Sequence, residues 1–134
     1  MATEIQLLPD VTFSAGADLS AAQYKFVYLS ADNTVSVCSA TTQIPIGVLQ
    51  NAPSAAGQAA QVRVFGKTKL QADEAMSYGQ LVRTSADGQA ALLAPGTDTD
   101  KSCAGIVTKG AAAAGVYAEV MIGLIPANMA VALA

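Results

Sequence analysis

The sequence states one pattern twice, and this internal repeat constrains the fold more than any single motif does. Residues 47–66 contain a short apolar segment, a turn rich in Pro, Ser and Gly, and an alternating segment that ends at a glycine. Residues 105–123 follow the same order fifty-eight positions later. The offset carries Gly47 to Gly105, Gly57 to Gly115 and Val62 to Val120. Two copies of one supersecondary unit predict two similar structural units within a small fold.

An earlier strand–turn–strand pattern extends the repeat. Residues 25–38 recur at 80–93 with an offset of 55, and the longer loop at 95–101 accounts for the change of offset to 58. Turn residues recur about every ten positions, which is typical of short strands. We therefore predict an all-β fold: a small barrel or sandwich of short antiparallel strands with an internal pseudo-repeat. The exception is residues 72–78, which we expect to form one short helix that ends at Gly79.

The length of 134 residues suits one domain. We expect an N-terminal arm or edge segment at residues 1–22, because Pro9 interrupts its apolar pattern and limits it to an edge position. Residues 23–134 are then a single β domain made of two similar units, at about 24–66 and 79–123. The apolar tail after residue 123 is too short to span a bilayer, and we expect a terminal strand or a docking arm there.

The composition favours a surface that a partner covers. Only 13% of the residues are charged, against roughly a quarter in ordinary soluble domains. The net charge is -3 and the basic residues are scattered, which argues against nucleic acid as a partner because such binding needs clustered positive charge. The N-terminus lacks the basic run and apolar stretch of a secretory signal, and we expect no membrane partner.

The residue types offer no catalytic centre. The chain has no histidine, so the commonest general base and metal ligand is missing. The closest carboxylate pairs, Asp73 with Glu74 and Asp98 with Asp100, fall in a helix start and a turn, where acidic residues have structural uses. No glycine run has the spacing of a phosphate-binding loop. We therefore expect no enzyme activity, no cofactor and no metal site. For the only cysteines, Cys38 and Cys103, the sequence leaves a disulfide between them open, and we favour two buried free thiols.

These features together resemble the capsid decoration (cement) proteins of tailed bacteriophages. The resemblance covers roughly residues 47–123: it rests on GVLQNAP, SAAG and QAAQVRVFG, on the linker KTKLQADEAMSYGQLVRTSADG, and on AGIVTKGAAAAG followed by VYAEVMIG. It implies a barrel-like β domain that forms homotrimers and binds the major capsid protein on the outer surface of the virion. Such a protein is made in the host cytoplasm, stabilises the head against internal pressure and carries no catalytic residues.

The N-terminal segment is the candidate contact with the capsid or a neighbouring subunit. Its apolar residues are Ile5, Leu7, Leu8, Val11 and Phe13, and an extended segment of this kind can add to an exposed strand edge.

Two alternatives remain open. One is another phage structural component, from a tail, baseplate or fibre. The other is a small carbohydrate-binding or adhesion module that uses its four tyrosines, which are Tyr24, Tyr28, Tyr78 and Tyr117.

Overall fold

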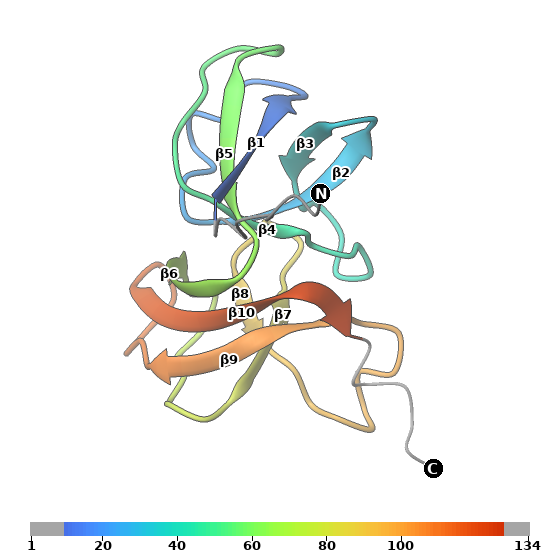
Figure 1. Cartoon of the computed structure of the whole chain (residues 1–134). Helices are drawn as coiled ribbons and strands as arrows, with labels where there is room; N and C mark the ends of the chain where they lie inside the picture. The colour runs from blue at the N-terminus through green and yellow to red at the C-terminus, as the bar shows by residue number, and fades with distance from the viewer. Residues whose placement is uncertain (1–9, 128–134) are drawn as a thin grey trace, which may run out of the picture.

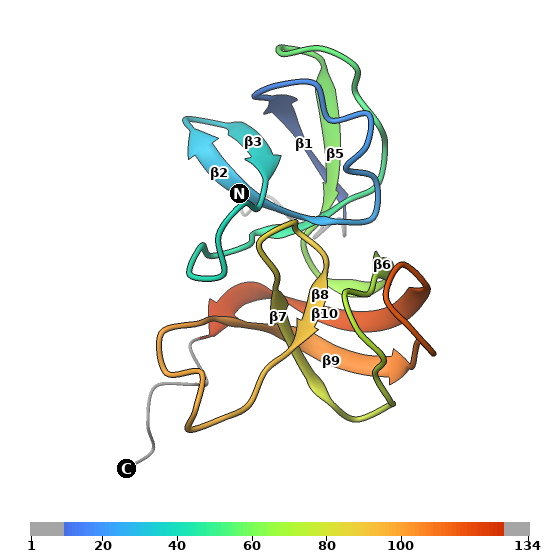
Figure 2. The same ribbon diagram turned by 180° about the vertical axis from the view of Figure 1, so that it is seen from behind.

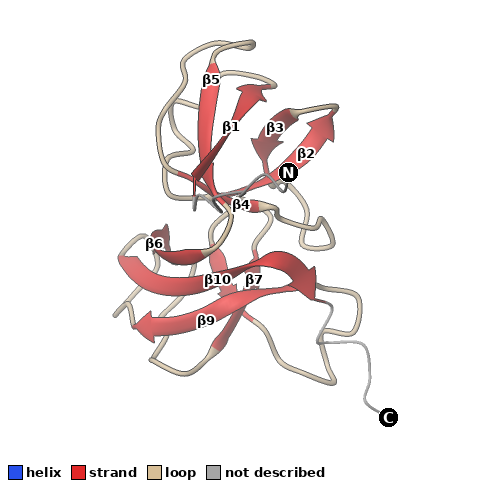
Figure 3. Cartoon of the chain, in the orientation of Figure 1, coloured by secondary structure: helices blue, strands red, loops and turns tan. Residues whose placement is uncertain are grey.

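The computed structural model describes residues 10–127, and within that range the chain forms ten strands and no helix (Figures 1 and 3). The strands are β1 Asp10–Ala15, β2 Phe26–Ala31, β3 Thr34–Val37, β4 Gly47–Leu49, β5 Ala59–Arg63, β6 Gly66–Gln71, β7 Leu81–Thr84, β8 Ala90–Leu92, β9 Cys103–Lys109 and β10 Tyr117–Ala127. The predicted all-β fold of mainly antiparallel strands is confirmed.

The ten strands form two sheets of five, one after the other along the chain. The first sheet has the order β1-β3-β2-β4-β5 and closes on itself, because β1 also pairs with β5. The second has the order β6-β10-β9-β7-β8. Figures 1 and 2 show the first sheet above the second, with the short linker between β5 and β6 at their junction. We call residues 10–65 unit 1 and residues 66–127 unit 2.

The strand pairings of the two units correspond residue for residue. Val27 lies opposite Gly47 in unit 1, and Val82 lies opposite Gly105 in unit 2. The other pairs of these strands obey the same offsets of 55 and 58. The repeat read in the sequence is therefore present as a repeat of backbone hydrogen bonding.

The correspondence extends to segments whose sequences hardly match. Strand β6 pairs with β10 as β1 pairs with β5, at an offset of 57 for the first strand of each unit. A parallel bridge between Ala72 and Ala90 brings β6 and β8 together. It is the equivalent of the parallel pairing of Ala15 with Val35 between β1 and β3. Both units thus use one five-strand arrangement, and β1 places residues 10–15 of the expected arm inside the first sheet.

Each unit has its own buried interior. In unit 1 alternate residues of the strands point into one cluster, which includes Val27, Val35, Leu49, Ala60 and Val62. Their equivalents in unit 2 form the second cluster, with Val82, Ala90, Val107, Ala118 and Val120. Three residues of unit 1, Phe26, Cys38 and Val48, belong to the cluster of unit 2. The alternation of a strand thus sends one set of side chains into its own unit and the other set into the junction.

The predicted helix at residues 72–78 is wrong. The Ala72 amide donates to the Val116 carbonyl at 2.9 Å, and Met76 exchanges backbone hydrogen bonds with Ala111 at 2.9 and 3.0 Å. These long-range partners replace the local bonds of a helix, so tertiary pairing overrides the helix propensity of the Ala-Asp-Glu-Ala-Met run. The described residues accordingly contain no helix of the length and apolar character needed to cross a membrane.

Two pairs of equivalent turn residues show why the repeat tolerates sequence differences. Asn33 and Gly88 both end their hairpin turns with a positive φ, of 50° and 78°. Tyr24 and Gly79 are likewise equivalent, with φ values of 62° and 84°. Glycine adopts this left-handed conformation without strain, and asparagine adopts it more easily than most residues. The backbone path is conserved between the units even where the residue type is not.

Candidate functional site

Two of the five predicted contact residues fall within the described structure. Ile5, Leu7 and Leu8 lie outside the described residues. Val11 and Phe13 are in β1, where they lie opposite Val62 and Ala60 of β5. Phe13 is half-buried and packs against the interior of unit 1, whereas the Val11 side chain is 39% exposed. The segment therefore reaches the sheet at Asp10, and Val11 is its exposed apolar residue within β1.

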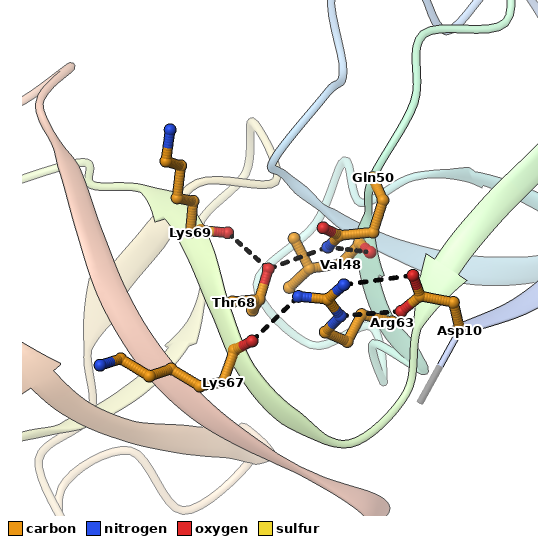
Figure 4. Close-up of polar contacts among 7 residues, drawn as sticks. All are labelled: Asp10, Val48, Gln50, Arg63, Lys67, Thr68 and Lys69. Atoms are coloured by element: carbon orange, nitrogen blue, oxygen red, sulfur yellow. Dashed lines mark hydrogen bonds and ion pairs between the residues drawn. The ribbon is translucent and has the colours of Figure 1, made fainter. Parts of the chain in front are cut away.

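The start of β1 is fixed by an ion pair at the junction between the two units (Figure 4). Arg63 Nε donates to Asp10 Oδ1 at 2.7 Å, and Arg63 Nη2 donates to Asp10 Oδ2 at 3.2 Å. Arg63 Nη1 also donates to the Lys67 carbonyl of β6 at 3.0 Å. The bond to Asp10 raises the pKa of the Arg63 guanidinium. One arginine therefore holds the first strand of unit 1 to the first strand of unit 2.

A second polar contact at the junction involves Gln50 (Figure 4). Its side-chain amide donates to the Thr68 hydroxyl at 2.8 Å and to the Val48 carbonyl at 3.1 Å. Thr68 is only 3% exposed, and its hydroxyl donates to the Lys69 carbonyl at 2.9 Å. Buried polar groups that are bonded in this way fix the relative position of the two units rather than weaken the junction.

The carboxylates of Asp98 and Asp100 form ion pairs with nearby cations, and Asp98 also accepts a hydrogen bond within a turn. Asp98 Oδ2 accepts the Ala94 amide at 2.8 Å, and the same oxygen lies 3.6 Å from Arg83 Nε. Lys101 Nζ lies 3.5 Å from Asp98 and 2.9 Å from Asp100. The hydrogen bond from Ala94, together with the two cations, holds the pKa of Asp98 below its ordinary value. A general base that works near neutral pH needs a shift in the opposite direction.

The other carboxylate pair has a structural contact. Glu74 accepts the Leu92 amide at 3.1 Å and so attaches the 72–78 segment to β8. Among residues 10–127, no three side chains of the His, Cys, Asp and Glu types gather in a way that could hold a metal ion. The arrangement of these acidic residues thus supports turns and strand edges.

The four tyrosines do not gather at one place. The rings of Tyr24 and Tyr117 meet edge to face, with centroids 5.7 Å apart, and Lys69 Nζ lies 5.6 Å from the Tyr24 ring. Tyr28 packs against the buried cluster of unit 2. Tyr78 is 81% exposed and lines a separate depression with Ala75 and Gly110. Because the four tyrosines lie at three separate positions, the structure gives little support to a binding face that they share.

Both cysteines are free thiols in the structure. Cys38 is buried at the junction, and burial raises its pKa to about 11. Cys103, at the start of β9, is half-buried, and burial also raises its pKa. Neither environment activates a thiolate.

Unit 2 has an exposed apolar face that sequence patterns alone do not single out. Ile106 and Met121 are paired across β9 and β10, and both side chains are more than 40% exposed. Leu81 lies opposite Ile106 on the other side, and it lines an apolar depression with Leu93 and Pro95. The usable signal is the repeat itself, because Leu81 and Ile106 are the equivalents of Phe26 and Val48, which are buried in unit 1.

Comparisons with known proteins identify a fold. No family model matches the sequence, and no curated protein matches it. Among solved structures, the chain is similar to the N base of the head fiber protein gp8.5 of bacteriophage phi29. The TM-score is 0.64 at 20% sequence identity, and the match covers 87% of this chain and 95% of that chain. The two proteins therefore share a fold over nearly their whole compared lengths.

Proposed function

We propose that this chain is a structural protein of a bacteriophage virion, located on the outside of the capsid. The observation that carries the proposal is the fold match to the phi29 head fiber base, which spans both units rather than one of them. The resemblance of residues 47–123 to capsid decoration proteins points to the same class. The low charge content suits a surface that is covered after assembly.

The way in which the protein would stabilise a head follows from the contacts that join its two units. A protein that braces a pressurised shell must transmit load without changing shape. Two hydrogen-bonded sheets that pack on each other are more rigid than loops and suit this role. The ion pair of Asp10 with Arg63 and the bond of Gln50 to Thr68 join the units. Residues 1–9 directly precede β1, so a contact made by Ile5, Leu7 and Leu8 would be anchored at this junction. The major capsid protein is the proposed partner, and a homotrimer is the proposed assembly.

A head fibre base is the second candidate, and the same comparison favours it. The similar phi29 structure is the base of a fibre, so this chain would attach a fibre to a head rather than cover the head as cement. The carbohydrate-binding alternative has less support because the tyrosines are dispersed.

The test is to mix the purified protein with purified heads that lack it and to image the complexes. Density repeated over the whole shell supports the decoration function, and density at a few sites supports the fibre base. Absence of bound protein under all conditions contradicts both. A variant that lacks residues 2–9 tests the contact segment, because head binding by that variant at the level of the full chain would remove the role proposed for Ile5, Leu7 and Leu8.

A further inference from the structure

Unit 1 packs on unit 2 through a set of residues whose equivalents in unit 2 have no corresponding unit to pack on among the described residues. Unit 1 packs on unit 2 through Phe26, Cys38 and Val48, each at most 1% exposed and each in the buried cluster of unit 2. Arg63 continues this line of residues, since it lies opposite Val48 in β5. We call these four residues the packing row. Their strand neighbours, such as Val27 and Leu49, point into unit 1 instead.

Unit 2 contains an equivalent row that is wholly apolar, in which Leu93 is buried and the described residues leave Ile106 and Met121 exposed. The strand pairings and the backbone bond from Leu93 to Leu81 assign the equivalents of the packing row. In the same order, they are Leu81, Leu93, Ile106 and Met121. We call them the equivalent row. Ile106 is 41% exposed and Met121 is 43% exposed, and Figure 1 shows β9 and β10 side by side at the front of unit 2. Contiguous exposed apolar side chains of this kind mark interaction surfaces.

Unit 1 in turn exposes the positions through which unit 2 receives the packing row. The Thr84 side chain lies beside Cys38 of the packing row, and the Thr68 hydroxyl accepts a hydrogen bond from Gln50, two residues after Val48. Both threonines are almost fully buried. Their equivalents in unit 1, from the pairings with β3 and β5, are Leu29 and Val11. These two side chains are 49% and 39% exposed. Unit 1 thus presents apolar side chains at positions that are polar and covered in unit 2.

We propose that the equivalent row of one chain packs against the surface around Val11 and Leu29 on unit 1 of a second copy. The occupant is a second copy because both halves of the contact lie on this chain, and the packing of unit 1 on unit 2 already shows the same elements in contact. The association is head to tail, so it forms a closed ring when the rotation per copy closes and a filament when it does not. A ring of three matches the proposed homotrimer. The inference rests on that part of the proposed function and is independent of head binding.

The test uses charged substitutions on each side of the contact. I106K with M121K places two charges on the equivalent row, and L29K places one on the receiving surface. V116K is the matched control, because Val116 is 43% exposed but belongs to neither surface. Mass is measured by light scattering over a range of concentrations, and circular dichroism verifies that each variant keeps the β fold. We expect a multimer for the wild type and for V116K, and a monomer of 13.5 kDa for both other variants.

A mixing experiment tests the head-to-tail geometry. The I106K/M121K variant keeps an intact receiving surface, and L29K keeps an intact equivalent row. An equimolar mixture should therefore form dimers of twice the monomer mass, because the equivalent row of L29K can still pack on the receiving surface of I106K/M121K. A mixture that stays monomeric would overturn the proposal in favour of a contact between like surfaces.

Three further results would also overturn it. They are a wild-type chain that is monomeric at every concentration, charged variants that keep the wild-type mass, and a monomer that associates only after residues 1–9 or 128–134 are removed. The last result would assign the surface to the chain's own terminal segment. Head binding is measured separately. If the wild type does not bind heads but the charged substitutions still convert its multimer to a monomer, only the proposed function is rejected.

Discussion

Asp10 and Arg63 lie opposite each other in β1 and β5 and form a two-point ion pair, with N–O distances of 2.7 and 3.2 Å. The pair closes the ring of the first sheet at its start, and the third donor of the same guanidinium reaches the Lys67 carbonyl of unit 2. The position where the chain enters the fold is therefore also the position where the two units are joined.

The first prediction concerns this ion pair. Asp10→Ala should lower the free energy of unfolding by about 1 kcal/mol, since the pair is bidentate but both side chains are about one-third exposed. Urea denaturation at low and high salt measures the effect, and the difference from wild type should shrink as salt screens the pair. Asp87→Ala, at an exposed turn, is the control and should have a smaller effect. Equal losses in the two variants would contradict the role given to Asp10.

The second prediction compares two glycines. A Cβ on Gly88 would lie 2.7 Å from Val37 Cγ2 and 3.1 Å from the Phe26 carbonyl oxygen, whereas a Cβ on Gly115 would meet nothing within 4 Å. Both residues have a positive φ. Gly115→Ala should therefore cost about 1–2 kcal/mol from backbone strain alone. Gly88→Ala should cost clearly more because it also forces unit 1 away from unit 2. Thermal unfolding of both variants gives the comparison, and equal costs would show that the junction yields easily.

The third prediction concerns the buried thiol. The folded-state pKa of Cys38 is raised to about 11, above the unfolded value of about 8.5. The contribution of this thiol to stability is fully present below pH 8.5 and is lost as pH rises toward 11, by roughly 3 kcal/mol in total. Cys38→Ala should flatten the fall in unfolding free energy between pH 8.5 and 11. A slope equal to that of wild type would contradict the burial assigned to Cys38.

The fourth prediction concerns acid stability. The pKa of Asp98 is held below its ordinary value by the Ala94 amide and by Arg83 and Lys101. The stabilisation is therefore present above the unfolded pKa of about 4 and is lost as pH falls through the folded value. Asp98→Asn should be less stable than wild type at pH 7, and the gap should narrow below pH 4. Unfolding free energies from pH 7 to pH 2 measure this, and a constant gap would show that the carboxylate charge is not involved.

Sequence reasoning found the strands of both units other than β1, because alternation and turn residues are local signals. It missed the equivalence of residues 10–19 with 67–76, since Val11, Phe13 and Leu19 are matched there by Thr68, Leu70 and Met76 rather than by identical residues. The same gap led to the helix assigned to residues 72–78. Backbone bonds to Val116 and Ala111 decide that segment, and pairing across such distances leaves no periodic trace in the sequence.

The candidate site was predictable to a lesser degree. Apolar spacing led to the prediction that Val11 is a contact residue. The structure shows its side chain 39% exposed, and the contact itself stays a prediction. Ile106 and Met121 look like ordinary strand residues in the sequence. Their exposure becomes apparent only when the packing of Phe26 and Val48 is known, because burial between units is a property of the tertiary arrangement.

The heat stability of DNA-filled heads tests the bracing function most directly. Heads that lack the protein are titrated with it, and the temperature at which DNA is released is followed with a dye that fluoresces on DNA. The proposed function predicts that the release temperature rises with added protein and reaches a plateau when the binding sites are full. A release temperature that stays constant while imaging shows the protein bound to the heads would contradict the bracing function.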